Sequence, residues 1–258
     1  SAGMVWPLAV NMKDFKLNYY STIKIQSKIF YCGGQRNKPQ TYGTMYELDL
    51  SKETKEIREL EGLPALRYGY SMAAVEDYIY VCGGKFIGDS IRDNWLASRI
   101  TYRFCIHSHV WTKTAPMNRV RQDCNVVAFN GLIYAFGGHN DEIIENSIEV
   151  YDPSTNVWTL LDDRIEITME NSLTVFQNKI FILTRTGYFQ SFDPVTGEIS
   201  VLPSIRAFRT GSYRLISHEH GIFAFHPEAT IQMWKPSLFS WKLEYIRVYS
   251  TLKESPRL

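Results

Sequence analysis

The sequence predicts an all-β protein in which short antiparallel sheets repeat along the chain. The first observation is composition: of 258 residues, 45% are apolar and 14% are aromatic, with 16 Tyr and 14 Phe, which favour strands. The second is a degenerate repeat of about fifty residues. The third is the alternation of apolar and polar residues over short stretches bounded by turn residues, which is typical of half-buried strands.

The repeat is marked first by aliphatic stretches, three of which end in a glycine pair. They are Ile29–Gly34, Ile79–Gly84, Ile133–Gly138, Ile180–Thr184 and Ile222–His226, the last two without the glycines. Equivalent positions are 33, 83, 137, 184 and 226, so the steps are 50, 54, 47 and 42 residues. Glycine at a strand end permits close backbone approach or unusual dihedrals, so each stretch is predicted to be the second strand, b, of its unit.

A second landmark follows each stretch and predicts strands c and d. The pairs are Ile148–Pro153 with Trp158, Phe189–Pro194 with Ile199, Ile231–Pro236 with Trp241, Thr101–Phe104 with Trp111, and Tyr46–Asp49 with the weaker Lys55–Ile57. Asp-Pro and the residues after it are of the types that favour turns, so a turn is predicted between strands c and d. Asn130-Gly131, between two apolar stretches, predicts a tight hairpin between strands a and b. Each repeat is therefore expected to carry four strands, a to d.

One four-stranded sheet cannot bury both of its faces, whereas a radial arrangement packs each sheet on its neighbours, with the Trp as a contact between them. Gly-Gly after an aliphatic strand, Tyr or Phe before Asp-Pro, and then Trp resemble the Kelch motif, from about Trp6 to Trp241. The resemblance implies a Kelch-type β-propeller of about five four-stranded antiparallel blades. Val5-Trp6 and Ile246–Ser250 leave an incomplete sixth blade as the alternative.

We expect three segments: an expression scar and linker over 1–14, the Kelch propeller over 15–250, and a C-terminal tail over 251–258. Lys plus Arg is 28 and Asp plus Glu is 27, a formal net charge of +1, so the chain has no global field to attract nucleic acid. No apolar run is long enough to cross a bilayer. Four cysteines are too few for a disulfide scaffold. We expect a cytoplasmic protein, with the nucleus as the alternative location.

No catalytic residue, cofactor or metal site is expected. His218 and His220 fall at one end of a strand pair and His226 at the other, so they should not converge on a metal ion. Cys32 and Cys82 share one repeat position and are predicted to be buried free thiols. Asp141-Glu142 is predicted to be a solvated turn pair. Neither a nucleophile elbow nor a phosphate-binding loop is present.

Candidate partner-binding residues lie in the loops at one mouth of the predicted propeller. Arg67 and Arg121 stand sixteen residues before the first glycine of repeats 2 and 3, and Arg209 lies beside the same position in repeat 5. The d–a connections also carry Tyr68, Tyr70, Gln122, Asn171 and Tyr213, and the b–c loops carry Arg36, Lys85, His139, Asn140 and Arg185. Arginine binds carboxylates through two bonds, so a short acidic or phosphorylated protein segment is expected. Alternatively, each arginine packs on a neighbouring blade and holds the loops.

By the same resemblance, this face is where BTB–Kelch proteins recruit substrates for cullin-RING ubiquitin ligases. The chain is therefore expected to be a substrate-receptor module that binds a degron-like segment of a partner. Cullin would bind through a BTB domain absent from this chain, and ligase activity would reside in partner subunits. An actin-binding cytoskeletal Kelch protein and a small-molecule Kelch-propeller enzyme remain as alternatives. No nucleic-acid or membrane partner is expected.

Overall fold

The computed structural model describes residues 18–35, 43–54, 56–65, 67–87, 95–162, 165–167, 171–205, 213–225, 231–238 and 240–244. The chain divides into two compact units, Ser1–Glu170 and Asn171–Leu258, which are described one at a time. The predicted linker, the predicted tail and both candidate segments of a sixth blade lie outside the described residues. No helix within these ranges is long and apolar enough to span a membrane.

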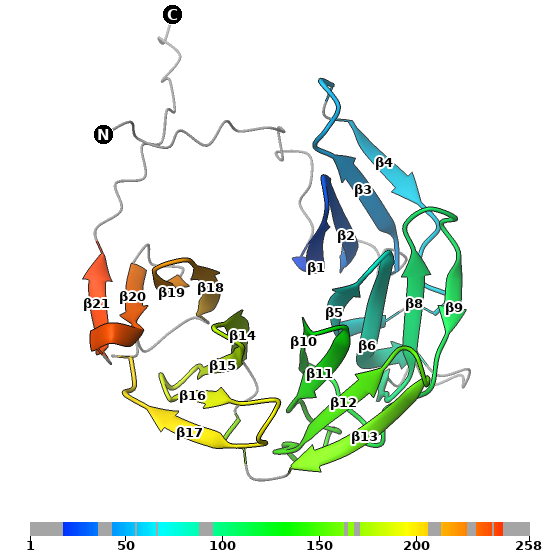
Figure 1. The fold of residues 1–258 in the computed structure, drawn as a ribbon. Helices are drawn as coiled ribbons and strands as arrows, with labels where there is room; N and C mark the ends of the chain where they lie inside the picture. Colours follow the sequence, from blue (N-terminus) through cyan, green and yellow to red (C-terminus); the bar gives the residue numbers. More distant parts are fainter. Residues whose placement is uncertain are drawn as a thin grey trace, which may run out of the picture. The chain divides into compact units, whose positions relative to one another are not determined.

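The first unit contains three antiparallel sheets, blades 1 to 3, with the predicted a-b-c-d strand order (Figure 1). Blade 1 consists of β1 (Asn18–Ile25), β2 (Lys28–Gln35), β3 (Met45–Asp49) and β4 (Ile57–Leu60). Blade 2 consists of β5 (Arg67–Val75), β6 (Tyr78–Ile87), β8 (Thr101–Cys105) and β9 (Trp111–Lys113), with β7 (Trp95–Ala97) added against β6. Blade 3 consists of β10 (Asn125–Phe129), β11 (Leu132–Phe136), β12 (Ile148–Asp152) and β13 (Val157–Asp162).

The second unit contains two further sheets of the same order, blades 4 and 5. Blade 4 consists of β14 (Asn171–Phe176), β15 (Lys179–Thr184), β16 (Phe189–Phe192) and β17 (Ile199–Leu202). Blade 5 consists of β18 (Arg214–His218), β19 (Gly221–Phe225), β20 (Ile231–Lys235) and β21 (Ser240–Glu244), with the short 3-10 turn η3 (Pro236–Leu238) before β21. The repeat therefore predicted the order of the strands in all five blades.

The seven-residue spacing of the second landmark is the register of the c–d hairpins. Tyr151 pairs with Trp158, Phe104 with Trp111, Phe192 with Ile199, and Trp234 with Trp241, each pair seven residues apart. In blade 1, Leu48 pairs with Ile57, nine residues further on. The longer turn explains why the landmark of the first repeat looked weak. The predicted a–b hairpin at Asn130-Gly131 is confirmed, because both residues have positive φ between β10 and β11.

Apolar side chains fill the space between successive blades of one unit. Phe30 and Phe104 meet edge to face at 6.3 Å between blades 1 and 2, and Tyr80 meets Tyr151 at 5.6 Å between blades 2 and 3. In the second unit, Phe189 meets Trp234 at 5.4 Å. Such aromatic pairs add to the area that they bury. Cys32 and Cys82 lie in the first two of these clusters, and the prediction that they are buried free thiols is confirmed.

Each tryptophan of a described d strand also bonds to the blade before it. The indole Nε1 donates to the carbonyl oxygen of Glu61 from Trp111 (2.9 Å), of Ala115 from Trp158 (3.1 Å) and of Pro203 from Trp241 (3.0 Å). Each acceptor follows the d strand of the preceding blade. The repeated tryptophan therefore combines a large apolar contact with one directional bond between blades.

The glycine pairs are required where one blade approaches the next. Gly83 has φ of 71° and its Cα faces the carbonyl oxygen of Arg121 in blade 3, so that a Cβ there would overlap that oxygen. The adjacent Gly84, with φ of 88°, donates its N–H to the same carbonyl at 2.8 Å. L-residues rarely adopt such positive φ values. The predicted role of the glycines in close backbone approach is thus confirmed.

Candidate functional site

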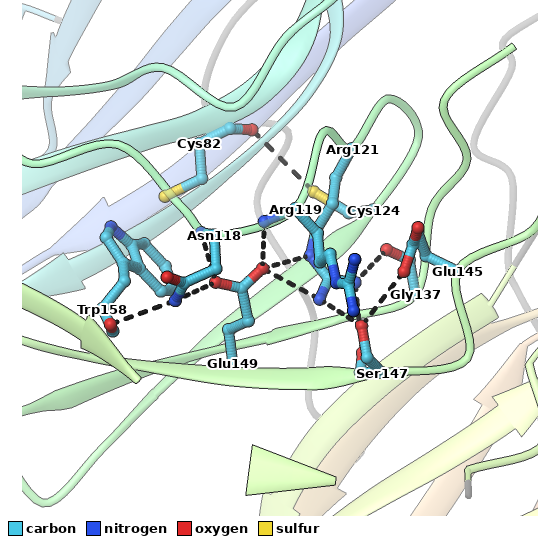
Figure 2. Close-up of polar contacts among 10 residues, drawn as sticks. All are labelled: Cys82, Asn118, Arg119, Arg121, Cys124, Gly137, Glu145, Ser147, Glu149 and Trp158. Carbon is cyan, nitrogen blue, oxygen red and sulfur yellow. Dashed lines mark hydrogen bonds and ion pairs between the residues drawn. The ribbon is translucent and has the colours of Figure 1, made fainter. Parts of the chain in front are cut away.

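Arg121 lies in the d–a connection of blade 3, as predicted, but its side chain is buried against its own blade (Figure 2). Nη1 donates to the carbonyl oxygens of Gly137 (2.7 Å) and Ser147 (3.1 Å), and Nη2 donates to the Ser147 hydroxyl (2.6 Å). Nε and Nη2 each lie 3.0 Å from Oε1 of Glu149, and both side chains of this ion pair are 0% exposed. The guanidinium is thereby committed to the ends of strands b and c.

Glu149 ties this arginine to the segment that leads into blade 3. Its carboxylate accepts bonds from the backbone N–H groups of Asn118 (2.6 Å) and Arg119 (3.0 Å), and from the Asn118 side chain (2.9 Å). Asn118 in turn donates to the carbonyl oxygen of Trp158 at 3.0 Å. Charge pairing with several hydrogen bonds compensates the cost of burying the carboxylate. The connection is therefore held from within the blade.

Arg67 has the equivalent position in blade 2, where it is the first residue of β5 and is 1% exposed. Nη1 donates to the carbonyl oxygens of Gly83 (3.0 Å) and Ile100 (3.3 Å), so the offset of sixteen residues to the first glycine is the same as in blade 3. The place of Glu149 is taken by Tyr102, whose ring centre lies 5.2 Å from the guanidinium carbon. Burial lowers the pKa of Arg67 from its ordinary value.

These contacts correct the expectation that the repeat arginines present their charges around a rim. Arg67 and Arg121 are enclosed because an arginine fork can donate to two strand-end carbonyl groups at once. The carbonyl groups of Ile100 and Ser147 also accept the N–H of Gly83 and Gly137. The alternative interpretation, in which each arginine packs on a neighbouring blade and holds the loops, fits their burial, but both guanidinium groups bond within their own blades. Arg209 and Arg36 lie outside the described residues. The expectation of an acidic ligand therefore loses two of the three arginines that supported it.

The other predicted residues are distributed over both units. In the first unit Tyr70 and Gln122 are buried, and Tyr68 is half-buried. In the second unit Asn171 and Tyr213 are buried, while Arg185 is exposed in the turn after β15. Tyr213 belongs to the apolar cluster of blades 4 and 5. Whether any of these residues contacts a partner stays a prediction.

The structure does bring Lys85, Gln122 and His139 together, at the edge between blades 2 and 3. Lys85 forms an ion pair with Asp141, and the same carboxylate accepts a bond of 3.2 Å from the Gln122 amide. His139 lies 2.7 Å from that amide through Nδ1 and 3.2 Å from Asp123 Oδ2 through Nε2. The hydrogen bond from Lys85 is the main cause that lowers the pKa of Asp141. These residues form the polar cluster (Lys85, Gln122, Asp123, His139 and Asp141).

Lys85 reaches this cluster from a strand, whereas the sequence predicted a loop. Strand β6 continues beyond Gly83-Gly84, and Lys85 pairs with Ala97 of β7. The b–c connection of blade 2 thus begins and ends as a two-stranded ribbon. Asp123 and Asp141 were not among the predicted site residues, although they adjoin Gln122 and Asn140 in sequence; Asp141 is an ion-paired residue and not simply a solvated one.

Residues 139–145, which we call the blade 3 turn, carry the remaining predicted residue of this face, Asn140. Its Oδ1 accepts bonds from the N–H groups of Glu142 (3.2 Å) and Ile143 (3.1 Å), and Glu145 N–H donates to Gly138 at 2.9 Å. The turn is therefore ordered by its own hydrogen bonds. It nevertheless exposes Ile143 and Ile144, at 59% and 43% of their surface. Exposed apolar side chains of this size were not predicted from the sequence.

The described residues, those of the polar cluster included, hold no group of three or more His, Cys, Asp or Glu side chains able to bind a metal ion. His218 ends β18 and His220 lies in the following turn, as predicted, and both are exposed. His226 lies outside the described residues.

Comparison with known families places most of the chain in one class. The family model described as the KLHDC2/KLHL20/DRC7 Kelch-repeats domain matches residues 15–184. Kelch-like protein 36 of Rattus norvegicus is 31% identical over 132 residues, which are 51% of this chain and 21% of that protein. Kelch-like protein 33 of Homo sapiens is 37% identical over 109 residues, or 41% of this chain and 19% of that protein.

A viral relative is similar at a lower level. Kelch repeat and BTB domain-containing protein 2 of Ectromelia virus (strain Moscow) is 27% identical over 126 residues, covering 49% of this chain and 22% of that protein. The chain thus spans about a fifth of the length of these three relatives. A solved structure of YjhT matches with a TM-score of 0.71 at 14% identity, over 81% of this chain and 72% of YjhT. That likeness concerns the fold alone, and it confirms the predicted Kelch-type β-propeller. The described residues form five four-stranded blades, to which β7 is an addition.

Proposed function

This chain belongs to the KLHDC2/KLHL20/DRC7 family of Kelch-repeat domains, and we propose that it is the substrate-receptor module of a BTB–Kelch adaptor for a cullin-RING ubiquitin ligase. It would bind a degron-like segment of a partner protein in the cytoplasm and perform no chemistry itself. Cullin would bind to a BTB domain outside this chain. The names of the relatives support this proposal, since three are Kelch-like proteins or carry both Kelch and BTB in their printed names.

The observation that carries the proposal is the exposure of Ile143 and Ile144 on an ordered turn. Propeller strands are committed to packing, so that the loops between them are free to bind. Neighbouring exposed apolar side chains mark interaction surfaces. Because the blade 3 turn is held by its own hydrogen bonds, little conformational entropy remains to be lost on binding.

The test uses the full-length protein that contains this chain, tagged and expressed in cells. Bound proteins are quantified by mass spectrometry for the wild type, a turn variant (Ile143→Asp with Ile144→Asp) and an edge variant (Val157→Asp with Leu160→Asp). We expect cullin to bind all three and a set of substrates to be lost only from the turn variant. Those substrates should also accumulate when cullin activation is inhibited. Absence of cullin, or substrates that are insensitive to the turn variant, would refute the adaptor function.

A second candidate function, binding to actin or another cytoskeletal protein, is favoured by a different surface. Val157, Leu160 and Leu161 are exposed on β13, the last strand in the order of blade 3. An apolar edge strand is a place where another chain can pair. Co-sedimentation with filamentous actin that is abolished by the edge variant and unchanged by the turn variant would favour this function.

A further inference from the structure

Strand β7 and the blade 3 turn both adjoin the polar cluster between blades 2 and 3. Leu96 is 51% exposed on β7, next to Ala97. The backbone of Ala97 hydrogen-bonds to the carboxylate of Asp141, which also pairs with Lys85. These contacts hold β7 beside the turn that carries Ile143 and Ile144. Leu96 pairs with Phe86, so its side chain lies on the opposite face of the β6–β7 ribbon from Lys85 and Ala97. The exposed apolar patch on the side of the turn therefore consists of Ile143 and Ile144.

The surroundings of this patch are acidic. The side chains of Asp123 and Asp141 are 48% and 39% exposed, Glu142 is exposed and Glu145 is half-buried. Lys85 is the cation of the same cluster, and it is 17% exposed and already paired with Asp141. The exposed Arg99 and Arg119 lie in the connections before β8 and β10, and no ion pair within the described residues joins them to the turn. Among the described residues of this region, the carboxylates therefore outnumber the available cations.

The polar cluster also holds an acceptor without a donor. Gln122 is 4% exposed, and its Oε1 has no hydrogen-bond partner within the described part of the chain. Its amide nitrogen is within hydrogen-bond distance of His139 and of the Asp141 carboxylate. An unsatisfied buried acceptor costs free energy, which is recovered only when a donor reaches the atom through a shift of the turn that covers it. An ammonium or guanidinium group is such a donor, whereas a carboxylate is not.

We propose that the partner segment bound at this patch is basic and apolar: an apolar side chain contacts Ile143 and Ile144, and flanking Lys or Arg side chains face the carboxylates. The inference rests on the proposed function and names the chemistry of the segment that it recognises. It replaces the acidic segment that exposed arginines would have favoured. Complementary charge would set the specificity and the association rate, and contact with the apolar patch would add affinity.

The test is selection of a displayed library of random heptapeptides on the purified protein. We expect selected peptides to be enriched in Lys and Arg beside one or two large apolar residues. Labelled copies of the best peptide should bind at least tenfold more weakly to Glu142→Lys and to Ile143→Ser. Two matched controls, Glu53→Lys on the c–d turn of blade 1 and Val157→Ser on β13, should bind it like the wild type. Higher salt should weaken the binding, since the charges are near the surface.

Three outcomes would overturn the inference. Enrichment of acidic or neutral peptides would do so, as would basic peptides whose affinity is unchanged in Glu142→Lys and Ile143→Ser. Self-association of the wild type that is lost in Ile143→Ser would assign the patch to a second copy of the chain. These results do not depend on cullin binding or on the capture of substrates by the full-length protein. The proposed function is therefore tested separately, by the mass-spectrometric comparison.

Discussion

The guanidinium of Arg121 lies 3.0 Å from the carboxylate of Glu149, and neither side chain is exposed. The pair joins the segment that enters blade 3 to strand β12, while Nη1 of Arg121 closes the gap between the ends of β11 and β12. Arg67 makes the same carbonyl contacts in blade 2 but faces Tyr102 in place of a carboxylate. The same buried arginine arrangement therefore occurs in two blades, with a carboxylate beside the guanidinium in blade 3 and an aromatic ring in blade 2.

Removing either member of the buried pair should destabilise the protein strongly. Arg121→Ala and Glu149→Ala are each expected to lower the free energy of unfolding by about 3–5 kcal/mol, because each leaves an uncompensated buried charge. Arg119→Ala, which removes an exposed arginine two residues away, should change it by less than about 0.5 kcal/mol. Denaturant unfolding measures all three. Equal midpoints for Arg121→Ala and Arg119→Ala would contradict the clamp role.

Gly83→Ala should be more costly than Gly131→Ala. Both glycines have positive φ, 71° and 76°, so each substitution carries backbone strain of about 1–3 kcal/mol. A Cβ at Gly131 meets nothing within 4 Å, while one at Gly83 overlaps the Arg121 carbonyl oxygen. Overpacking should add about 1–3 kcal/mol at Gly83 alone. The difference between the two variants in the free energy of unfolding, measured by heat or denaturant, gives the cost of the steric overlap at Gly83. Equal losses of stability would contradict the close approach of the blades there.

Trp158→Ala should cost about 3–5 kcal/mol, the loss typical of a deleted core aromatic side chain. Trp158 is buried, its ring centre lies 5.1 Å from that of Tyr151, and its Nε1 donates to Ala115. Trp158→Phe keeps much of the ring and should cost less, mainly through the lost hydrogen bond and the smaller ring. Denaturant unfolding of both variants measures the two contributions. A near-neutral Trp158→Ala would mean that the indole does not connect blades 2 and 3.

The four cysteines should differ sharply in reactivity. Hydrogen bonds from Ser108 lower the pKa of Cys105, so that its reactive thiolate forms at lower pH than in an ordinary cysteine. Burial raises the pKa of Cys32 and Cys124 to about 12, and it also raises the pKa of Cys82. Iodoacetamide followed by mass spectrometry should label Cys105 alone in the native protein and all four in denaturant.

The pH dependence of this labelling supplies its control. In Ser108→Ala the largest cause of the lowered pKa is removed, so the labelling rate of Cys105 should rise at higher pH than in the wild type. Native labelling of Cys32 at a rate similar to that of Cys105 would contradict the buried placement of strand β2.

The strand pattern could be predicted because it is set by local chemistry. The Asp-Pro landmark followed by Trp158 predicted strands c and d of one repeat, and the structure pairs Tyr151 directly with Trp158. Asn130-Gly131 predicted a turn because it suits positive φ at both positions. Glycine pairs recur in blades 1 to 3 and tryptophans in the d strands of blades 2, 3 and 5, where they meet the neighbouring blade of the same unit.

The direction and burial of the arginines could not be predicted in this way. Arg67 and Arg121 occupy equivalent loop positions, and a loop arginine is ordinarily exposed. Their burial depends on carbonyl groups at the ends of strands b and c and, for Arg121, on Glu149, which lies 28 residues further along the chain. Nor does the sequence show that β6 runs on to pair with β7, which places Lys85 against Asp141.

The sequence alone thus determined the all-β repeat, the order of the strands and the positions where blades touch, because strand alternation, turn chemistry and repeat spacing act over a few residues. Only the tertiary structure decided which polar side chains are buried and which apolar side chains stay exposed. Arg67 and Arg121 were drawn inward, where they donate to strand-end carbonyl groups, and Leu96, Ile143 and Ile144 were left outside on ordered elements. The physical reason is that burial and hydrogen-bond satisfaction are settled between segments far apart in the chain.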